Sequence, residues 1–179
     1  MLLLLLLLLL LLLLLQGNEL GAQGVGSIAD ALKTNAALEV LELAGNGTGD
    51  LGAALLADAL KANGTLRRLG LAGGDIGDEG VGLLADALKT NSALTDLELS
   101  ANDIGDRGAG QLAEALKSYS TLATLGLAEN HVGALGLGAL ADALKSNATL
   151  TSLELRGNRV GPEGVRMLAD VLVRPLATD

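Results

Sequence analysis

The sequence has no cysteine, phenylalanine or tryptophan, and it contains one histidine and one tyrosine among its 179 residues. The absence of cysteine excludes disulfide bonds and cysteine-ligated zinc, and it is typical of a reducing compartment. The single histidine, His131, follows an asparagine at a position that should face solvent. Catalytic triads and histidine-rich metal sites are therefore not expected. We predict a protein that is not an enzyme, needs no cofactor or metal, and resides in the cytoplasm.

Positive charge is also scarce. Twelve Lys and Arg residues face twenty-one Asp and Glu residues, which gives a formal net charge of −9. Binding to nucleic acid requires a basic stripe along the phosphates, and the sequence has none. An acidic surface suits a basic protein partner, although it also serves solubility. Without large aromatic residues, the core must be built mainly from leucine.

Leucine-rich segments recur every 28 residues, and this period determines the expected fold. Each segment begins with the pattern LxxLxLxx, usually followed by Asn, and continues through a glycine-containing turn into a stretch such as LADALKTN. A fixed period in this range is typical of a solenoid, in which each repeat packs only on its neighbours. We place six repeats in residues 10–177, starting at Leu10, Leu38, Leu66, Leu94, Leu122 and Leu150.

Each repeat is expected to contain one strand and one helix. In the second repeat Leu41 and Leu43 alternate with polar or small residues, which predicts a half-buried strand with both leucines pointing inward. Residues 81–89 have the apolar spacing of a helix. Glycines recur eleven and fourteen residues after each repeat start, where we expect positive φ or close approach of neighbouring turns. The Lys-x-Asn ending is typical of a helix C-terminus.

The pattern LxxLxLxxNxIGxxGxxxLAxALKxN resembles the ribonuclease-inhibitor-like class of leucine-rich repeats, which includes ribonuclease inhibitor, the Ran GTPase activator and repeat domains of innate immune receptors. The resemblance implies an α/β leucine-rich-repeat solenoid, an open horseshoe with parallel strands on the concave face and helices on the convex face. It also implies that the recurring asparagine turns inward and bonds the backbone of adjoining turns. These ladder positions are Asn18, Asn46, Asn102, Asn130 and Asn158, with Gly74 in the third repeat.

Leucine fills positions 2–15 without interruption. As a helix, 14 leucines would span only about 21 Å, too short for a hydrocarbon core of about 30 Å. A signal peptide is a second interpretation, and it would make the protein secreted, but no basic segment or clear cleavage site accompanies the run. The repeat register requires leucine at positions 10, 13 and 15. We therefore favour residues 10–15 as the first strand and residues 1–9 as an excess segment outside the fold.

The outward strand positions vary in a regular way. Between the second and third leucines of repeats two to six the sequence reads Glu, Gly, Glu, Gly, Glu. Strands lie about 4.8 Å apart, so the three glutamates should stand about 10 Å apart on the concave face. The glycines should leave shallow gaps between them. Neighbouring charges complete a candidate partner-binding set: Glu42, Arg68, Gly70, Asp96, Glu98, Gly126, Glu154 and Arg156.

The expected function is a non-enzymatic scaffold that binds a protein on its concave face. Two alternatives follow from the resemblance: a GTPase-activating regulator of a small GTPase, and a ligand-sensing fragment of an innate immune receptor. Neither terminal repeat carries a polar cap. We therefore expect either a segment of a longer repeat array or a small protein that associates with itself at one end.

Overall fold

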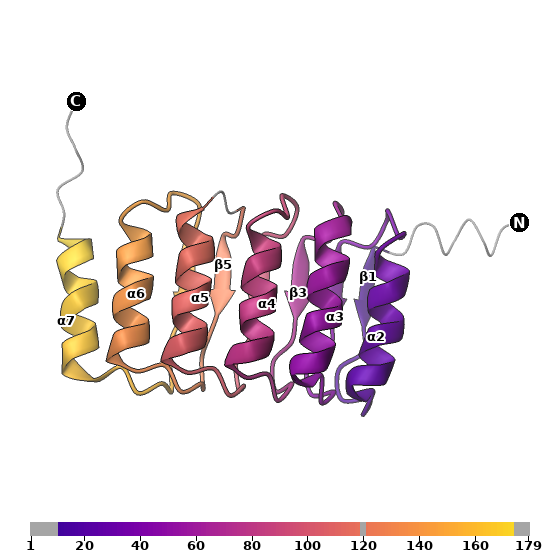
Figure 1. Cartoon of the computed structure of the whole chain (residues 1–179), viewed down its shortest axis with the longest axis horizontal. Helices are drawn as coiled ribbons and strands as arrows, with labels where there is room; N and C mark the ends of the chain where they lie inside the picture. The colour runs from indigo at the N-terminus through magenta and orange to yellow at the C-terminus, as the bar shows by residue number, and fades with distance from the viewer. Residues whose placement is uncertain (1–10, 119–120, 174–179) are drawn as a thin grey trace, which may run out of the picture.

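The computed structural model describes residues 11–118 and 121–173, and within these ranges short parallel strands alternate with helices (Figure 1). The strands are β1 (Leu12–Leu14), β2 (Val40–Glu42), β3 (Arg68–Gly70), β4 (Asp96–Glu98), β5 (Thr124–Gly126) and β6 (Ser152–Glu154). The helices are α2 (Gly21–Leu32), α3 (Gly49–Ala62), α4 (Asp78–Leu88), α5 (Asp106–Lys117), α6 (Ala134–Leu144) and α7 (Gly161–Leu172). The excess leucine segment, residues 1–9, lies outside the described residues.

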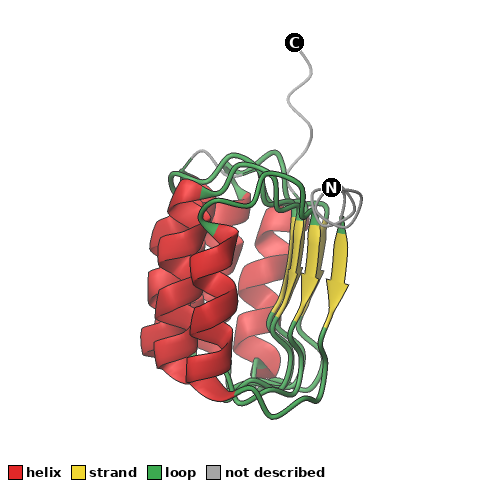
Figure 2. Cartoon of the chain, turned by 90° about the vertical axis from the view of Figure 1, so that its right-hand side faces the viewer, coloured by secondary structure: helices red, strands yellow, loops and turns green. Residues whose placement is uncertain are grey.

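The strands form one parallel sheet in chain order, β1-β2-β3-β4-β5-β6. Each residue pairs with the residue 28 positions later, as Leu41 does with Leu69. Seen from the end, the sheet forms one layer and the helices the other (Figure 2). This is the expected α/β leucine-rich-repeat solenoid. We refer to the outward surface of the sheet as the strand face and to the outward surface of the helices as the helix face.

Inward-pointing leucines of the strands form the core together with the inner faces of the helices. Leu41, Leu69 and Leu97 are at most 1% exposed because a neighbouring repeat covers each on both sides. The corresponding residues of the end repeats, Leu13 and Leu153, are only partly buried. Burial of each leucine therefore depends on stacking, as expected for a solenoid. No helix among the described residues is long and apolar enough to cross a membrane.

The residue seven positions after each repeat start, in the turn that follows the strand, has positive φ. Four of these residues are glycine, and the other two, Ala101 and Glu129, have φ of 55° and 56°. A non-glycine residue in this region is strained by roughly 1–2 kcal/mol. The surrounding hydrogen bonds therefore impose this turn shape even where the sequence does not favour it.

The glycines that we expected at positive φ behave in two ways. Gly21, Gly49 and Gly161 have φ near 58°, as predicted. Gly77, Gly105 and Gly133 are extended instead, and for them the close approach of the neighbouring turn is observed, because a carboxylate of the preceding repeat lies against each. The difference follows from the repeat before. Asp50 Oδ1 accepts hydrogen bonds from the N–H groups of Gly77 (2.8 Å) and Gly80 (3.0 Å).

Asp78 and Asp106 bond the next repeat in the same way, and we call these three residues the cross-repeat caps. Asp78 accepts from Gly105 and Gly108, and Asp106 accepts from Gly133 and Gly136. Each carboxylate thus caps the first turn of the following helix, where N–H groups lack partners within the helix. Alanine stands at the equivalent positions 22 and 134, and there the next glycine adopts positive φ.

The inner asparagines form a hydrogen-bonded ladder along the solenoid. Asn102 donates from Nδ2 to the carbonyls of Leu71 (3.0 Å) and Leu99 (2.9 Å). Its Oδ1 accepts from the N–H groups of Gly74 and Ile76 of the preceding repeat. Asn46, Asn130 and Asn158 make equivalent bonds to the repeat before them. The side chain of Asn18 bonds only carbonyls of its own turn, because no repeat precedes it in the described part of the chain.

A second asparagine ladder runs along the opposite edge, where the helices end. Asn63 Nδ2 donates to the carbonyls of Leu32 and Asn35 in the preceding repeat, and its Oδ1 accepts from the N–H groups of Thr65 and Leu66. Asn91 repeats this pattern. The sequence pattern suggested only a helix C-cap here. The asparagine instead links neighbouring repeats, because its backbone is extended and its side chain points inward.

The ladder predicts a large cost for Asn102→Ala. The change leaves buried N–H and carbonyl groups of two repeats without partners, so it should lower the free energy of unfolding by about 1–3 kcal/mol. Urea denaturation followed by circular dichroism measures this. Asn18→Ala is the matched control, since Asn18 bonds only its own exposed turn, and it should cost clearly less. Equal losses in the two variants would contradict the ladder as the link between repeats.

Gly74→Asn should be neutral or stabilising, by up to about 1 kcal/mol, because the amide would restore the missing ladder bonds. The buried Thr48 hydroxyl next to this position has no hydrogen-bond partner, and a Cβ on Gly74 would lie 3.4 Å from it. The same Cβ would be 3.0 Å from the Leu71 carbonyl, which limits the gain. Gly64→Asn is the matched control, because it makes the same substitution at a position where the added Cβ would meet no atom within 4 Å. A marked loss of stability in Gly74→Asn alone would rule out a restored ladder.

Candidate interaction surface

The strand face presents the outward side chains of β2 to β6 in one row. The register places Glu42 beside Gly70, Glu98 beside Gly126, and Gly126 beside Glu154. The alternation of acidic residue and glycine read from the sequence is therefore an alternation across neighbouring strands. All eight residues of the candidate partner-binding set lie in these strands or, for Arg156, just after one of them.

Glu42 is held by its neighbours on β3. Arg68 Nε donates to Glu42 Oε1 at 2.6 Å, and the Glu42 side chain is only 14% exposed. This hydrogen bond raises the pKa of Arg68, and the charges of Glu42, Asp96 and Glu98 act in the same direction. The Glu42 carboxylate also lies directly over Gly70, so that a Cβ there would collide with it. The shallow gap expected at Gly70 is therefore filled by Glu42.

Glu98 lies over Gly126 in the same manner. Its carboxylate carbon would be 2.5 Å from a Cβ at Gly126, so the second expected gap is also filled. Glu98 Oε1 accepts a hydrogen bond from the N–H of Ser100, and Asp96 Oδ2 accepts one from the Thr95 hydroxyl. Within residues 11–118 and 121–173, neither carboxylate has a cation within ion-pair distance. The centre of the strand face is therefore negatively charged.

The far end of the row is less compensated than its beginning. Glu154 is exposed on the last strand and forms no ion pair with another described residue. Arg156 pairs with Glu129 through Nη2 and Oε1 at 3.2 Å, not with Glu154. Because Arg68 neutralises Glu42, three carboxylates remain without a cation: Asp96, Glu98 and Glu154. We call these three residues the acidic strand patch.

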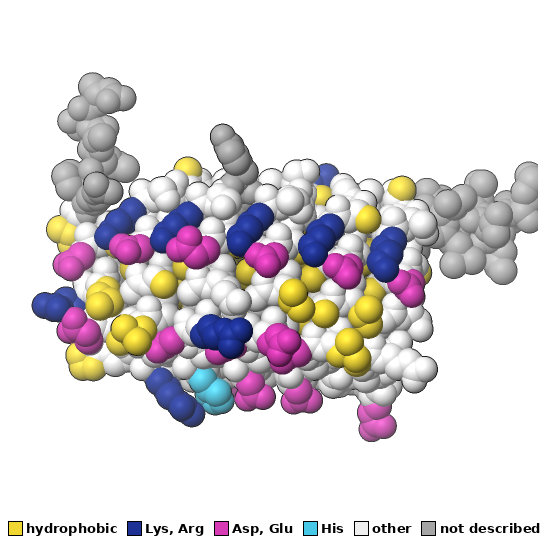
Figure 3. Space-filling model, in the orientation of Figure 1, with side chains coloured by type: hydrophobic (Ala, Val, Ile, Leu, Met, Phe, Trp, Pro, Cys, Tyr) yellow, Lys and Arg dark blue, Asp and Glu magenta, His cyan; other side chains and the backbone are white. Residues whose placement is uncertain are grey.

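The helix face carries charge of both signs in regular rows (Figure 3). Lysines near the helix ends pair with an acidic residue three positions earlier, as Lys33 does with Asp30 and Lys89 with Asp86. Such exposed pairs contribute little to stability. Leu51 and Leu135 are the most exposed leucines on this face. The rows of opposite charge compensate each other, so this face has no single-sign patch like that on the strands.

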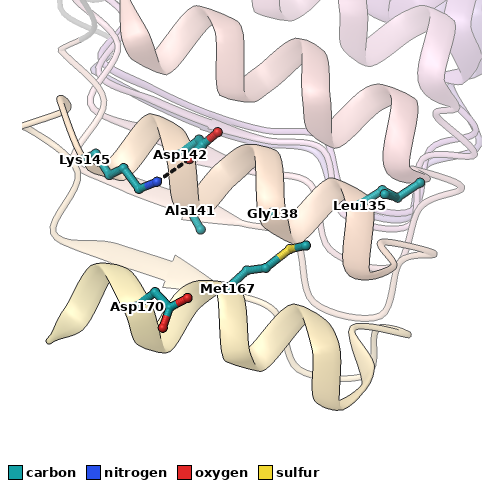
Figure 4. Close-up of a pocket in the computed structure, with 7 residues that line it drawn as sticks. All are labelled: Leu135, Gly138, Ala141, Asp142, Lys145, Met167 and Asp170. Atoms are coloured by element: carbon teal, nitrogen blue, oxygen red, sulfur yellow. Dashed lines mark hydrogen bonds and ion pairs between the residues drawn. The ribbon is translucent and has the colours of Figure 1, made fainter.

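A shallow groove with a volume of 310 Å³ lies between α6 and α7 on the helix face. Met167 lies against Gly138 on its floor, and Lys145 pairs with Asp142 on its rim (Figure 4). The hydrogen bond and charge of Lys145 lower the pKa of Asp142. Asp170 approaches from α7. The groove is small and contains no nucleophile paired with a base.

The described residues contain no cluster of potential metal ligands. No group of three or more His, Asp or Glu side chains among them is close enough to hold a metal ion. His131 is exposed, and its Nε2 lies 3.5 Å from Asp103 Oδ1 on the turn edge of the solenoid. The candidate functional surface is therefore the strand face.

Comparison with known families identifies the repeats. Residues 62–85, 90–113 and 146–169 match the family described as Leucine Rich repeat. The chain contains leucine-rich repeats. The 28-residue period and the helix in every described repeat resemble the ribonuclease-inhibitor-like class of these repeats.

Solved structures share the fold of this chain at low sequence identity. One is "Leiomodin-1 Actin-Binding Site 2 (ABS2)", with a TM-score of 0.66 and 21% identity, covering 83% of this chain and 87% of that one. Another is the tropomodulin C-terminal domain from Caenorhabditis elegans, with a TM-score of 0.57 and 13% identity, covering 91% and 82%. At such identities the likeness concerns the fold alone. No curated protein gave a significant match.

The contact between Glu98 and Gly126 predicts coupling between these positions. Thr suits a strand better than Gly, but in the native chain Gly126→Thr must displace the Glu98 carboxylate. We expect Gly126→Thr to be nearly neutral alone and to stabilise by about 0.5–1 kcal/mol in a Glu98→Ala background. Chemical denaturation of the four proteins of this cycle measures the coupling. An identical effect of Gly126→Thr in both backgrounds would contradict the packed arrangement.

Proposed function

We propose that this chain is a non-enzymatic protein-interaction module that binds a basic protein segment on its strand face. The observation that carries the proposal is the acidic strand patch, in which Asp96, Glu98 and Glu154 have no cationic partner among the described residues. Asp96 and Glu98 lie two residues apart on β4, and Glu154 lies two strands away on β6. Repulsion among these like charges disfavours the free state slightly, and a cationic partner would relieve it. The rows of opposite charge on the helix face lack this property.

The shape of the strand face supports the same proposal. Small residues follow β2 to β5 at positions 44, 72, 100 and 128, so no bulky side chain shields Asp96 and Glu98 from that side. At the equivalent position after β6 the chain has Arg156. Gly70 and Gly126 allow the glutamates to lie flat. A lysine or arginine from an extended partner segment could therefore reach Glu98 and Asp96 together. The leiomodin-1 domain, which is described as an actin-binding site, supports protein binding as a use of this fold.

The proposal can be tested by NMR titration with a short Lys-Ala peptide. Amide shifts should concentrate on β4 to β6, and the triple change Asp96→Asn, Glu98→Gln and Glu154→Gln should weaken binding by about tenfold or more at low salt. Added salt should weaken the native complex, because the Debye length falls to about 8 Å at physiological ionic strength.

The matched control is the triple change Asp30→Asn, Asp58→Asn and Asp86→Asn on the helix face, which alters the net charge by the same amount. It should leave the affinity within about twofold, since these groups are exposed and already paired with lysines. If both triple variants lose affinity equally, only overall charge attracts the peptide. Shifts confined to the helices would also contradict binding on the strand face.

A further inference from the structure

The two ends of the described solenoid expose core positions of the repeat. Val165 on α7 is 53% exposed, whereas the same position in the five earlier repeats is at most 1% exposed (Val25, Ala53, Val81, Ala109 and Leu137). Leu153 and Leu168 are also only partly buried, although their equivalents Leu125 and Leu140 are fully buried. At the other end an apolar hollow of 260 Å³ opens beside Leu13, Ile28 and Leu32. Each end thus has the surface that an adjoining repeat covers elsewhere.

Hydrogen-bonding groups at the two ends are complementary. At internal junctions the N–H groups five and seven positions after a repeat start donate to the next strand, as Leu15 does to Glu42 (2.9 Å) and Gly17 to Ala44 (2.8 Å). On β6, the last strand of the sheet, the equivalent donors are Leu155 and Gly157. On β1, the first strand, the equivalent acceptors are the carbonyls of Leu14 and Gln16, which face away from β2.

The asparagine ladder leaves a matching pair of ends. Asn158 Oδ1 accepts from Val132 in the repeat before it, but in the described structure no later asparagine accepts from the N–H groups of Asn158 and Val160. Asn18, at the other end, donates through Nδ2 only to its own turn, and its Oδ1 has no donor from a preceding repeat. One ladder end therefore offers donors and the other offers an acceptor.

Charges nine positions after the repeat start are complementary as well. At one internal junction this position holds Asp103 in one repeat and His131 in the next, and their side chains meet at 3.5 Å. The same position holds Arg159 in the last repeat and Glu19 in the first, and both are exposed. Stacking the last repeat on a first repeat in the internal register would place Arg159 opposite Glu19. Ser27, the small residue on that end of α2, would face Arg166.

We propose that two copies of this chain dock head to tail, with the last repeat of one stacked on the first repeat of the other in the register of the internal junctions. The occupant of each exposed end is a second copy because the chain itself supplies the complementary donors, acceptors, apolar positions and charge. The interface is heterologous, since different surfaces meet, so it can continue into an open-ended chain of copies.

Sedimentation equilibrium of the full chain tests this. The weight-average mass should rise with concentration above the 18.0 kDa of one chain, without stopping at a dimer. Ser27→Arg should suppress association, because it places a bulky cation against Arg166 of the second copy. Ser92→Arg, an exposed position far from either end, should associate like the native chain. A native chain that remains monomeric up to its solubility limit overturns the proposal, whatever prevents the two ends from meeting.

A charge-exchange experiment fixes the register. Arg159→Glu or Glu19→Arg alone should weaken association by about tenfold, because like charges then meet at the junction. The double variant should associate nearly as the native chain does, and an equimolar mixture of the two single variants should also recover association. Association that is insensitive to Ser27→Arg and to these exchanges, as expected if the leucine run caused it, would overturn the head-to-tail interface.

Discussion

Buried backbone groups at the turns are the constraint on which the rest of this structure depends. Each repeat must reverse direction twice within 28 residues, and at both reversals N–H and carbonyl groups point into the solenoid where water cannot reach them. Two asparagine ladders satisfy these groups, one after the strands and one after the helices. The inward-pointing leucines supply most of the apolar burial, but their packing has no directional preference that would prevent one strand from shifting along the next. The amides supply that direction, and so fix the register of every strand.

The period allowed much of the fold to be predicted from sequence. The spacing of Leu41 and Leu43 predicted which side chains point inward, and the 28-residue interval predicted the strand pairing, because both follow from the geometry of a repeating chain. The side-chain conformations on the strand face were not predictable in the same way. The register alone places Glu42 next to Gly70, yet whether the carboxylate projects outward or lies on the glycine depends on Arg68 and on local contacts that no periodicity encodes.

Two other differences between expectation and structure have sequence signals that were overlooked. The position of the asparagine in LADALKTN at the end of a helix favours a helix C-cap. Its recurrence at intervals of 28 residues is equally typical of a link between repeats. The two conformations of the turn glycines correlate with a residue 27 positions earlier: Asp before Gly77, Gly105 and Gly133, and Ala before Gly49 and Gly161. In a solenoid a residue also contacts residues that lie one period away in the sequence. An interpretation that considers only its neighbours along the chain therefore misses its contacts with the adjacent repeats.

The cross-repeat caps also restrict how such an array can change by duplication. Asp50, Asp78 and Asp106 each require the second glycine of the following repeat, Gly80, Gly108 or Gly136, since a Cβ at Gly80 would approach Asp50 Cα to 2.9 Å. The cap and its glycines are therefore inherited as a unit that spans a repeat boundary. Recombination that exchanges whole repeats among the second to fourth keeps every cap opposite a glycine of the following repeat, because each of these three repeats carries the Asp and every repeat carries the glycine. A repeat taken from an array without the glycines would leave a carboxylate facing backbone that it cannot bond, and would be selected against for that reason alone.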